Sequence, residues 1–367
     1  MMTVHRILLA TIVASVGVLP LAAQDQPQPT LTSLQGKNTL SDEERNTLAQ
    51  WMNERIAAIG AEEPAPAAEA LTLLRTEFKG TDAFKEAYAA ALIESVRPAY
   101  KNAKLIAAAR LITALNTLND PDARGVLLEA LQDQRVGVRM AAVVGLRNLR
   151  VKLALAGTPV FTETLNGLRD AGKRETSSVT LKTIYQAMDY PAVVPSLPDA
   201  KANVATVLDL LEARAQQYAA REVPAEGAEV VGLKLGGTLR SAMDDAQRKR
   251  LTVIAAKMLR YGVTRYTSGD RPLFKVQKDA GRQIKELRNQ IELLIDQAEK
   301  LLLELVAPKD VPTPSIAEEM KKAADPILMK IAMNKWADIL KKAVNLDFYM
   351  DEAEGPTPPE EPPDGGG

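Results

Sequence analysis

The sequence predicts an all-α protein: a solenoid of repeated helix pairs, then a long C-terminal helical hairpin and a disordered tail. Three observations lead to this prediction. Helix-start signals recur at nearly constant intervals through the first half of the chain. Hydrophobic residues make up 46% of the 367 residues but aromatics only 4%, so the core must consist of Ala, Leu, Val and Ile. A heptad-like spacing of apolar residues marks a long helix near residues 284–305.

Composition excludes several kinds of chemistry. The chain has 46 Lys and Arg against 47 Asp and Glu, no Cys, and one His, which is His5. His5 falls in a segment interpreted below as a cleaved signal peptide, so the mature chain would have neither Cys nor His. Thiol nucleophiles, Ser-His-Asp triads, disulfides, structural zinc and His- or Cys-ligated haem are therefore excluded. We expect no catalytic residue, no cofactor and no metal.

Residues 1–23 have the three parts of a secretory signal peptide. Arg6 supplies the positive charge, Ile7–Leu19 is apolar, and Ala22-Ala23 provides small residues for cleavage before Gln24. The apolar run of about 13 residues is shorter than the ~20 needed to span a bilayer. We therefore expect an exported protein, periplasmic or extracellular, with no stable membrane insertion after the signal is cleaved.

The repeats are expected to occupy residues 41–220, after a polar linker at 24–40. Ser41 and Glu44 have the spacing of a capping box, which begins the first helix. An N-cap side chain satisfies a free backbone N–H, and proline suits the first helical position because it has no N–H to satisfy. Further helix-start signals stand at Asp82, Asp120-Pro121, Thr158-Pro159 and Leu197-Pro198, with spacings of 38, 38 and 39 residues.

The unit from Asp120 to Leu149 is the most regular. Its second half places small residues, Ala141, Ala142 and Gly145, where two helix backbones can approach closely. This segment resembles a HEAT repeat, a helix pair that stacks into a solenoid, with weaker likeness over 82–220. The resemblance implies a HEAT-like fold and structural roles for Asp133 and Arg139, which would tie neighbouring repeats together, and it says little about activity. The matching residues are Pro121, Asp133, Val138-Arg139, Ala141-Ala142 and Leu146.

The second half is expected to contain a helical connecting region, 221–271, and a long helical hairpin, 272–346. Within the first, 227–239 is interpreted as a loop or poor helix because of its glycines. A second apolar face is expected at Ile327, Ile331, Ile339, Ala343 and Leu346. The heptad seam either closes the solenoid end within one chain or forms an intermolecular coiled coil that gives a homodimer. Its residues are Ile284, Leu287, Ile291, Leu294, Leu301 and Leu305, with Ala298 between them.

Two charged segments bear on binding. Residues 347–367 form an acidic, Pro-rich tail that is expected to be disordered, since it has almost no apolar surface to bury. Arg147, Arg150 and Lys152 follow Arg139 on one helix without an intervening acid. They suggest a basic stripe for an acidic protein segment, a polyanion or the chain's own tail. The favoured alternative is a solvated helix face, with Arg150 and Lys152 complementing the helix dipole.

These observations favour a non-catalytic scaffold or adaptor that binds a protein partner through its helical-repeat surface. The alternative is a structural homo-oligomer assembled through the 284–305 seam. A carboxylate-dependent hydrolase using Asp244-Asp245 is a third and weaker interpretation, because adjacent acids at a helix start are ordinary dipole complements. The absence of a basic surface interleaved with aromatics argues against nucleic acid as a partner.

Overall fold

The computed structural model describes residues 31–61, 63–192, 194, 199–219, 225–268, 273–276, 281–306, 315–322 and 326–348. Helices make up 81% of these residues, and no strand occurs among them, which confirms the all-α prediction. The predicted signal peptide, the tail from residue 349 onward and the Leu197-Pro198 signal lie outside the described residues.

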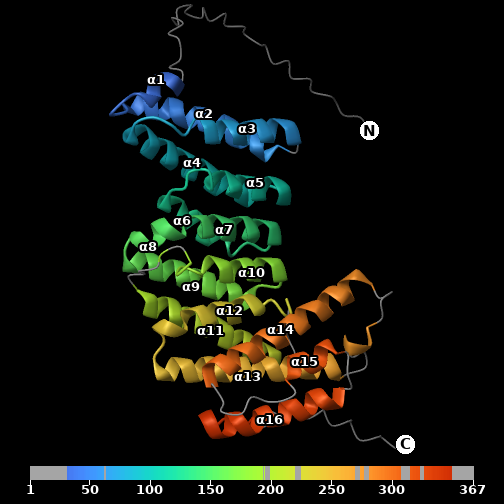
Figure 1. Cartoon of the computed structure of the whole chain (residues 1–367). Helices are drawn as coiled ribbons and strands as arrows, with labels where there is room; N and C mark the ends of the chain where they lie inside the picture. The colour runs from blue at the N-terminus through green and yellow to red at the C-terminus, as the bar shows by residue number, and fades with distance from the viewer. Residues whose placement is uncertain are drawn as a thin grey trace, which may run out of the picture.

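The helices form two rows that run the length of the molecule (Figure 1). In one row, α5 contacts α7, α7 contacts α10, α10 contacts α12, and α12 contacts α14. In the other row, α6 contacts α9, α9 contacts α11, and α11 contacts α13. The pairs are α4 (Asp82–Asn102) with α5 (Leu105–Leu115), α6 (Arg124–Ala130) with α7 (Val136–Asn148), α9 (Thr158–Arg174) with α10 (Ser178–Ala187), α11 (Ala200–Ala219) with α12 (Val230–Leu239), and α13 (Asp245–Thr267) with α14 (Arg282–Val306).

Both ends of the stack carry further helices (Figure 1). At the N-terminal end lie α1 (Leu31–Gln35), α2 (Asp42–Gly60) and α3 (Pro64–Thr76), and at the C-terminal end lie α15 (Ile316–Lys321) and α16 (Pro326–Val344). The short α8 (Arg150–Leu155) joins the second pair of the stack, α6 and α7, to the third, α9 and α10.

Two helix-start signals of the sequence act as N-caps. Ser41 caps α2 and forms a full capping box with Glu44. Asp120 accepts a hydrogen bond from the N–H of Asp122 at 2.9 Å. Asp82 and Thr158 differ, because each is the first helical residue: the N-cap of α4 is Thr81, and that of α9 is Gly157, at φ 104°.

Two expectations about local structure were wrong. The linker 24–40 contains helix α1. Among the described residues of the hairpin expected at 272–346, the long helix begins only at Arg282, and Leu273–Lys275 form a separate short turn. The segment 227–239, interpreted as a loop or poor helix, contains helix α12, because its glycines face buried side chains of neighbouring helices and the packing offsets their low helix propensity.

The hairpin predicted for 272–346 is also different. Helix α14 packs mainly against α13, which precedes it, and the two run antiparallel. The apolar face expected on α16 is displaced: Ile327 and Ile331 are exposed, whereas Met329, Ala332, Trp336 and Leu340 are buried. Trp336 fixes this register because its Nε1 donates to Glu299 of α14 at 2.9 Å.

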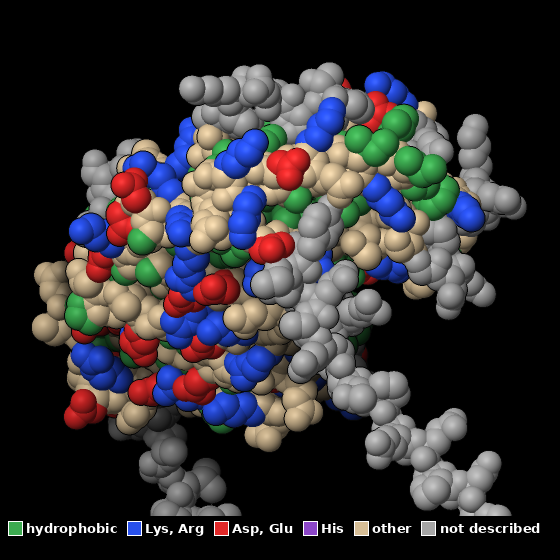
Figure 2. Space-filling model, turned by 90° about the horizontal axis from the view of Figure 1, so that it is seen from below, with side chains coloured by type: hydrophobic (Ala, Val, Ile, Leu, Met, Phe, Trp, Pro, Cys, Tyr) green, Lys and Arg blue, Asp and Glu red, His purple; other side chains and the backbone are tan. Residues whose placement is uncertain are grey.

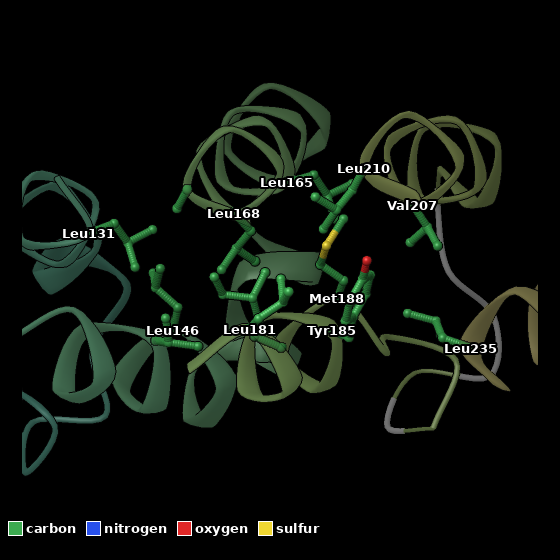
Figure 3. Packing of buried hydrophobic residues seen from close by; sticks show 14 of the residues in the cluster. Leu131, Leu146, Leu165, Leu168, Leu181, Tyr185, Met188, Val207, Leu210 and Leu235 are labelled. Atoms are coloured by element: carbon green, nitrogen blue, oxygen red, sulfur yellow. The ribbon is translucent and has the colours of Figure 1, made fainter. Parts of the chain in front are cut away.

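Each helix pair forms one layer of the stack. The apolar core continues from one layer to the next without interruption (Figure 3). Each pair buries side chains of its own and of the next pair, so a single pair would leave a large apolar face in water. Figure 3 follows this contact through residues of three successive pairs: Leu131, Leu146, Leu165, Leu168, Leu181, Tyr185, Met188, Val207, Leu210 and Leu235.

Glycine lets α12 approach its neighbours closely. A Cβ placed on Gly232 would lie 2.5 Å from Cε1 of Tyr185 and 2.7 Å from Cδ2 of Leu211, both fully buried. A Cβ on Gly237, five residues on in the same helix, would meet only Cδ1 of Leu301, at 3.4 Å. A methyl side chain would therefore clash at Gly232 but would fit at Gly237.

We expect Gly232→Ala to lower the free energy of unfolding by about 1–3 kcal/mol, because the added methyl group overpacks the contact with α10 and α11. Gly237→Ala is the matched control, and we expect it to leave stability unchanged or raise it by about 0.5–1 kcal/mol through helix propensity. Urea unfolding followed by circular dichroism measures both. Equal effects of the two substitutions would contradict the close approach at Gly232.

Candidate interaction surface

The predicted basic stripe is engaged in contacts between layers. Arg147 Nη1 donates to Oε1 of Gln186 at 2.9 Å. Arg150 Nη1 donates to the carbonyl oxygens of Gln186 and Asp189 at 2.9 and 2.7 Å, and burial lowers the pKa of this guanidinium. Lys152 Nζ donates to the carbonyl oxygen of Asn119 in the preceding layer. Each of these three cations thus donates a hydrogen bond from one helix pair to a neighbouring part of the stack.

Arg135, beside Asp133, links the α6–α7 turn to the layer before it. The Asp133 carboxylate accepts from the N–H and Nε of Arg135, both at 2.8 Å, and from its Nη2 at 2.6 Å. The hydrogen bond with Arg135 holds the pKa of Asp133 below its ordinary value. Positioned in this way, Arg135 donates to the carbonyl oxygens of Tyr100 and Ala103, at the end of α4.

Arg139 links the same turn to the layer after it. Its Nε and Nη2 each donate to the Glu175 carboxylate at 2.8 Å. Glu175 is 2% exposed and also accepts from the backbone N–H groups of Thr176 and Ser177. Burial raises the pKa of Glu175, but Arg139 and the two N–H groups outweigh it, so the net pKa is lowered. Arg135 and Arg139 thus hold three successive turns side by side.

The heptad seam belongs to the core of this chain. Ile291, Leu294 and Leu301 are buried, and Leu287 and Leu305 are half-buried. Gly262 of α13 packs on Ile295, and α12 contacts α14 as well. Only Ile284, at the start of α14, is exposed. The seam is thus covered within one chain and does not offer the free surface that an intermolecular coiled coil needs.

The structure gives the acidic pair Asp244-Asp245 a structural place at the start of α13. Asp244 is the N-cap and forms a capping box with Gln247, while Asp245 pairs with Arg248 at 3.3 Å. A cleft of about 430 Å³ nearby is lined by Arg240 and Arg248, but Arg240 already pairs with Glu304. Within the described ranges, no His, Cys, Asp and Glu residues cluster in a way that could hold a metal ion.

The feature that stands out is the turn edge, the edge of the stack formed by the α4–α5, α6–α7 and α9–α10 turns. At each turn, at least one of the first two residues of the second helix is a large, exposed apolar residue. The exposed fractions are 47% for Leu105, 65% for Ile106, 41% for Val136 and 60% for Val179. Isolated exposed apolar residues are common, whereas here they recur in the first two positions of three neighbouring second helices.

The turn edge is continuous and partly hollowed. Leu105 packs over the start of α7, since a Cβ on Gly137 would lie 3.2 Å from its Cδ1. A cleft of about 360 Å³ lies between the next two turns, lined by Val136, Thr176 and the Arg139–Glu175 pair among others. The edge therefore combines a row of apolar side chains with a cleft of mixed polarity.

Comparison of the chain with family models, with curated proteins and with solved structures finds no match. Among the residues that the structure describes, no helix is both long and apolar enough to cross a membrane. The functional assignment therefore depends on the geometry of the surface. The sequence analysis did not identify the turn edge, although large apolar residues directly after three successive turns were a readable signal.

We expect Arg139→Met to lower the free energy of unfolding by about 3–5 kcal/mol, because it leaves the Glu175 carboxylate buried without its cation. Arg147→Met is the control, expected to cost less than about 1 kcal/mol, since its partner Gln186 is neutral and exposed. The double variant Arg139→Met/Glu175→Met should recover most of the loss. Urea unfolding at pH 7 measures all three, and a double variant as unstable as Arg139→Met would contradict this account.

The ion pair between Arg139 and Glu175 also predicts that the free energy of unfolding depends on pH. Because the pKa of Glu175 is lowered on folding, its contribution is fully present above the ordinary value of 4.5 and is lost as the pH falls through the folded pKa. We expect the stability difference between the wild type and Glu175→Gln to be largest near pH 7 and to shrink below about pH 4. A difference independent of pH in urea unfolding would show that Glu175 does not titrate with folding.

Proposed function

We propose that this protein is a non-catalytic scaffold or adaptor, a HEAT-like solenoid that binds a protein partner through the turn edge. The observation that carries the proposal is the series of exposed apolar residues, Leu105, Ile106, Val136 and Val179, at the start of three successive second helices. Repeated-helix proteins use extended surfaces of this kind to bind other proteins.

The HEAT-like part of the proposal is supported by the spacing of the polar contacts between layers. Arg124 pairs with Glu163, 39 residues later, and Arg139 pairs with Glu175, 36 residues later. Arg250 pairs with Glu212, 38 residues earlier. These separations lie within three residues of the 38- and 39-residue spacing of the helix-start signals, as expected when each repeat contacts the next in a similar way.

A protein is the partner that suits this surface best. The apolar residues are spread along an edge and do not converge on one deep pocket, which a small molecule would need. The four side chains are each about half exposed, so burying them completely contributes about 3–6 kcal/mol before the cost of association, of at least similar size, is subtracted. That balance favours a reversible complex. The signal-like residues 1–23 support a periplasmic or extracellular setting, which belongs to the same proposal.

The test is a variant with Ile106→Glu, Val136→Glu and Val179→Glu. Glutamate is tolerated in the first turn of a helix because it complements the dipole, so we expect an unchanged melting temperature. The matched control is Val151→Glu/Leu155→Glu, at apolar residues of α8 that are 44% and 69% exposed and lie beyond the C-terminal end of α7.

Affinity capture from cell-envelope extract, with the chain from Gln24 onward as bait, measures the outcome. We expect one protein to be retained by the wild type and the control and lost with the turn-edge variant. Retention by the turn-edge variant would overturn the assignment of this surface. Loss of a concentration-dependent dimer in the same variant, by analytical ultracentrifugation, would instead identify the partner as a second copy.

A further inference from the structure

Helix α16 is the last layer of the stack, and its outer side is unusual. Its inner side is buried against α13 and α15 through Met329, Ala332, Trp336 and Leu340. On its outer side Ile327 is 60% exposed, Leu328 38% and Ile331 44%. The outer face of a terminal repeat is normally polar, because no further layer covers it. The exposed apolar residues therefore need a separate explanation.

Lysines flank Ile327 and Ile331 on both sides, and Leu328 lies just beyond the lysines of one side. At about 100° per residue, Lys330 and Lys341 fall on one side of the line through Ile327 and Ile331, and Lys335 and Lys342 fall on the other. All four lysines are exposed. Asp338, the one acidic residue in the helix, falls between Ile327 and Ile331 in angle and lies two to three turns closer to the C-terminus. Figure 2, which looks at this end of the stack, shows hydrophobic side chains grouped beside Lys and Arg. The outer face of α16 is thus apolar along its N-terminal half and basic along its borders.

We propose that the outer face of α16 docks the protein on an anionic bilayer surface. Ile327, Leu328 and Ile331 would enter the region between headgroups and acyl chains, while the lysines extend to the lipid phosphates. Apolar residues in the centre with lysines along the borders are the arrangement that interfacial helices use. The inference stands on α16 alone and is independent of the turn edge.

Two other occupants fit this face less well. A second copy packed on it through a two-fold axis would bring the four lysines of each α16 into one interface, with Asp338 as the one acidic residue that each α16 supplies. The chain's own segment 351–367 has six acidic residues but no large apolar side chain, so it could neutralise lysines without covering Ile327 and Ile331. An anionic lipid surface complements both the charge and the apolar character.

The experiment is flotation of the chain from Gln24 onward with vesicles of phosphatidylglycerol and phosphatidylcholine, compared with vesicles of phosphatidylcholine alone. We expect binding only to the anionic vesicles, weakened by added salt. Lys335→Gln/Lys342→Gln should lower the partition coefficient about fivefold for each lysine replaced. Ile327→Ser/Ile331→Ser should lower it at least as much, because it removes the apolar centre of the face.

Matched controls keep the test specific. Lys234→Gln/Lys300→Gln removes two exposed lysines of α12 and α14, and Val151→Ser/Leu155→Ser removes two exposed apolar residues of α8. Neither should change binding. The buried Trp336 reports by its fluorescence whether α16 stays packed in each variant. Absence of binding to anionic vesicles, equal loss in the controls, or a dimer that the α16 variants dissociate would overturn the proposal.

Discussion

The apolar contact between successive helix pairs is the interaction on which the rest of the structure depends. Each helix pair has an apolar surface on both of the sides that face its neighbours, and neither surface can be buried within the pair itself. Leu165 and Leu210 meet from neighbouring layers, as do Leu146 and Leu181 (Figure 3). Because the chain has few aromatic residues, this contact uses Leu, Val and Ala, whose small volumes require the layers to lie close together. The stack is stable only as a series of layers.

Close packing of the layers leaves backbone carbonyl groups at helix ends that need hydrogen-bond donors, and arginine side chains supply them. Helix ends leave backbone carbonyl groups without partners, and in this stack those ends lie at the borders between layers. Arg135 donates to carbonyl oxygens at the end of α4, and Arg150 donates to those of Gln186 and Asp189 near the end of α10. The planar guanidinium suits this task because it offers several donors in fixed directions. The cations that resemble a binding stripe in the sequence are therefore used to hold the layers together.

The sequence predicts helix starts, which depend on neighbouring residues, but it does not predict which helix face is buried where packing against distant helices determines that face. Ser41 and Asp120 mark helix starts because a cap acts within three residues of itself. The buried face of α16 could not be read in the same way. Spacing alone favoured Ile327 and Ile331, whereas the hydrogen bond between Trp336 and the buried carboxylate of Glu299 selects the other side. The sequence identified the apolar seam that includes Leu294. It could not identify α13 as the helix that covers this seam, because that contact depends on the fold of the whole chain.

The same reasoning explains why the two proposed surfaces are visible only in the structure. Val136 and Ile327 are ordinary apolar residues in sequence, and exposure distinguishes them from core residues of the same type. The turn edge lies in the layers from α4 to α10, and α16 lies at the far end of the stack (Figure 1). A stack of helix pairs separates such sites by a fixed number of pairs, because each pair is packed on the next. If α16 rests on a bilayer, the layers between α10 and α16 would hold the partner of the turn edge at a set distance from the membrane.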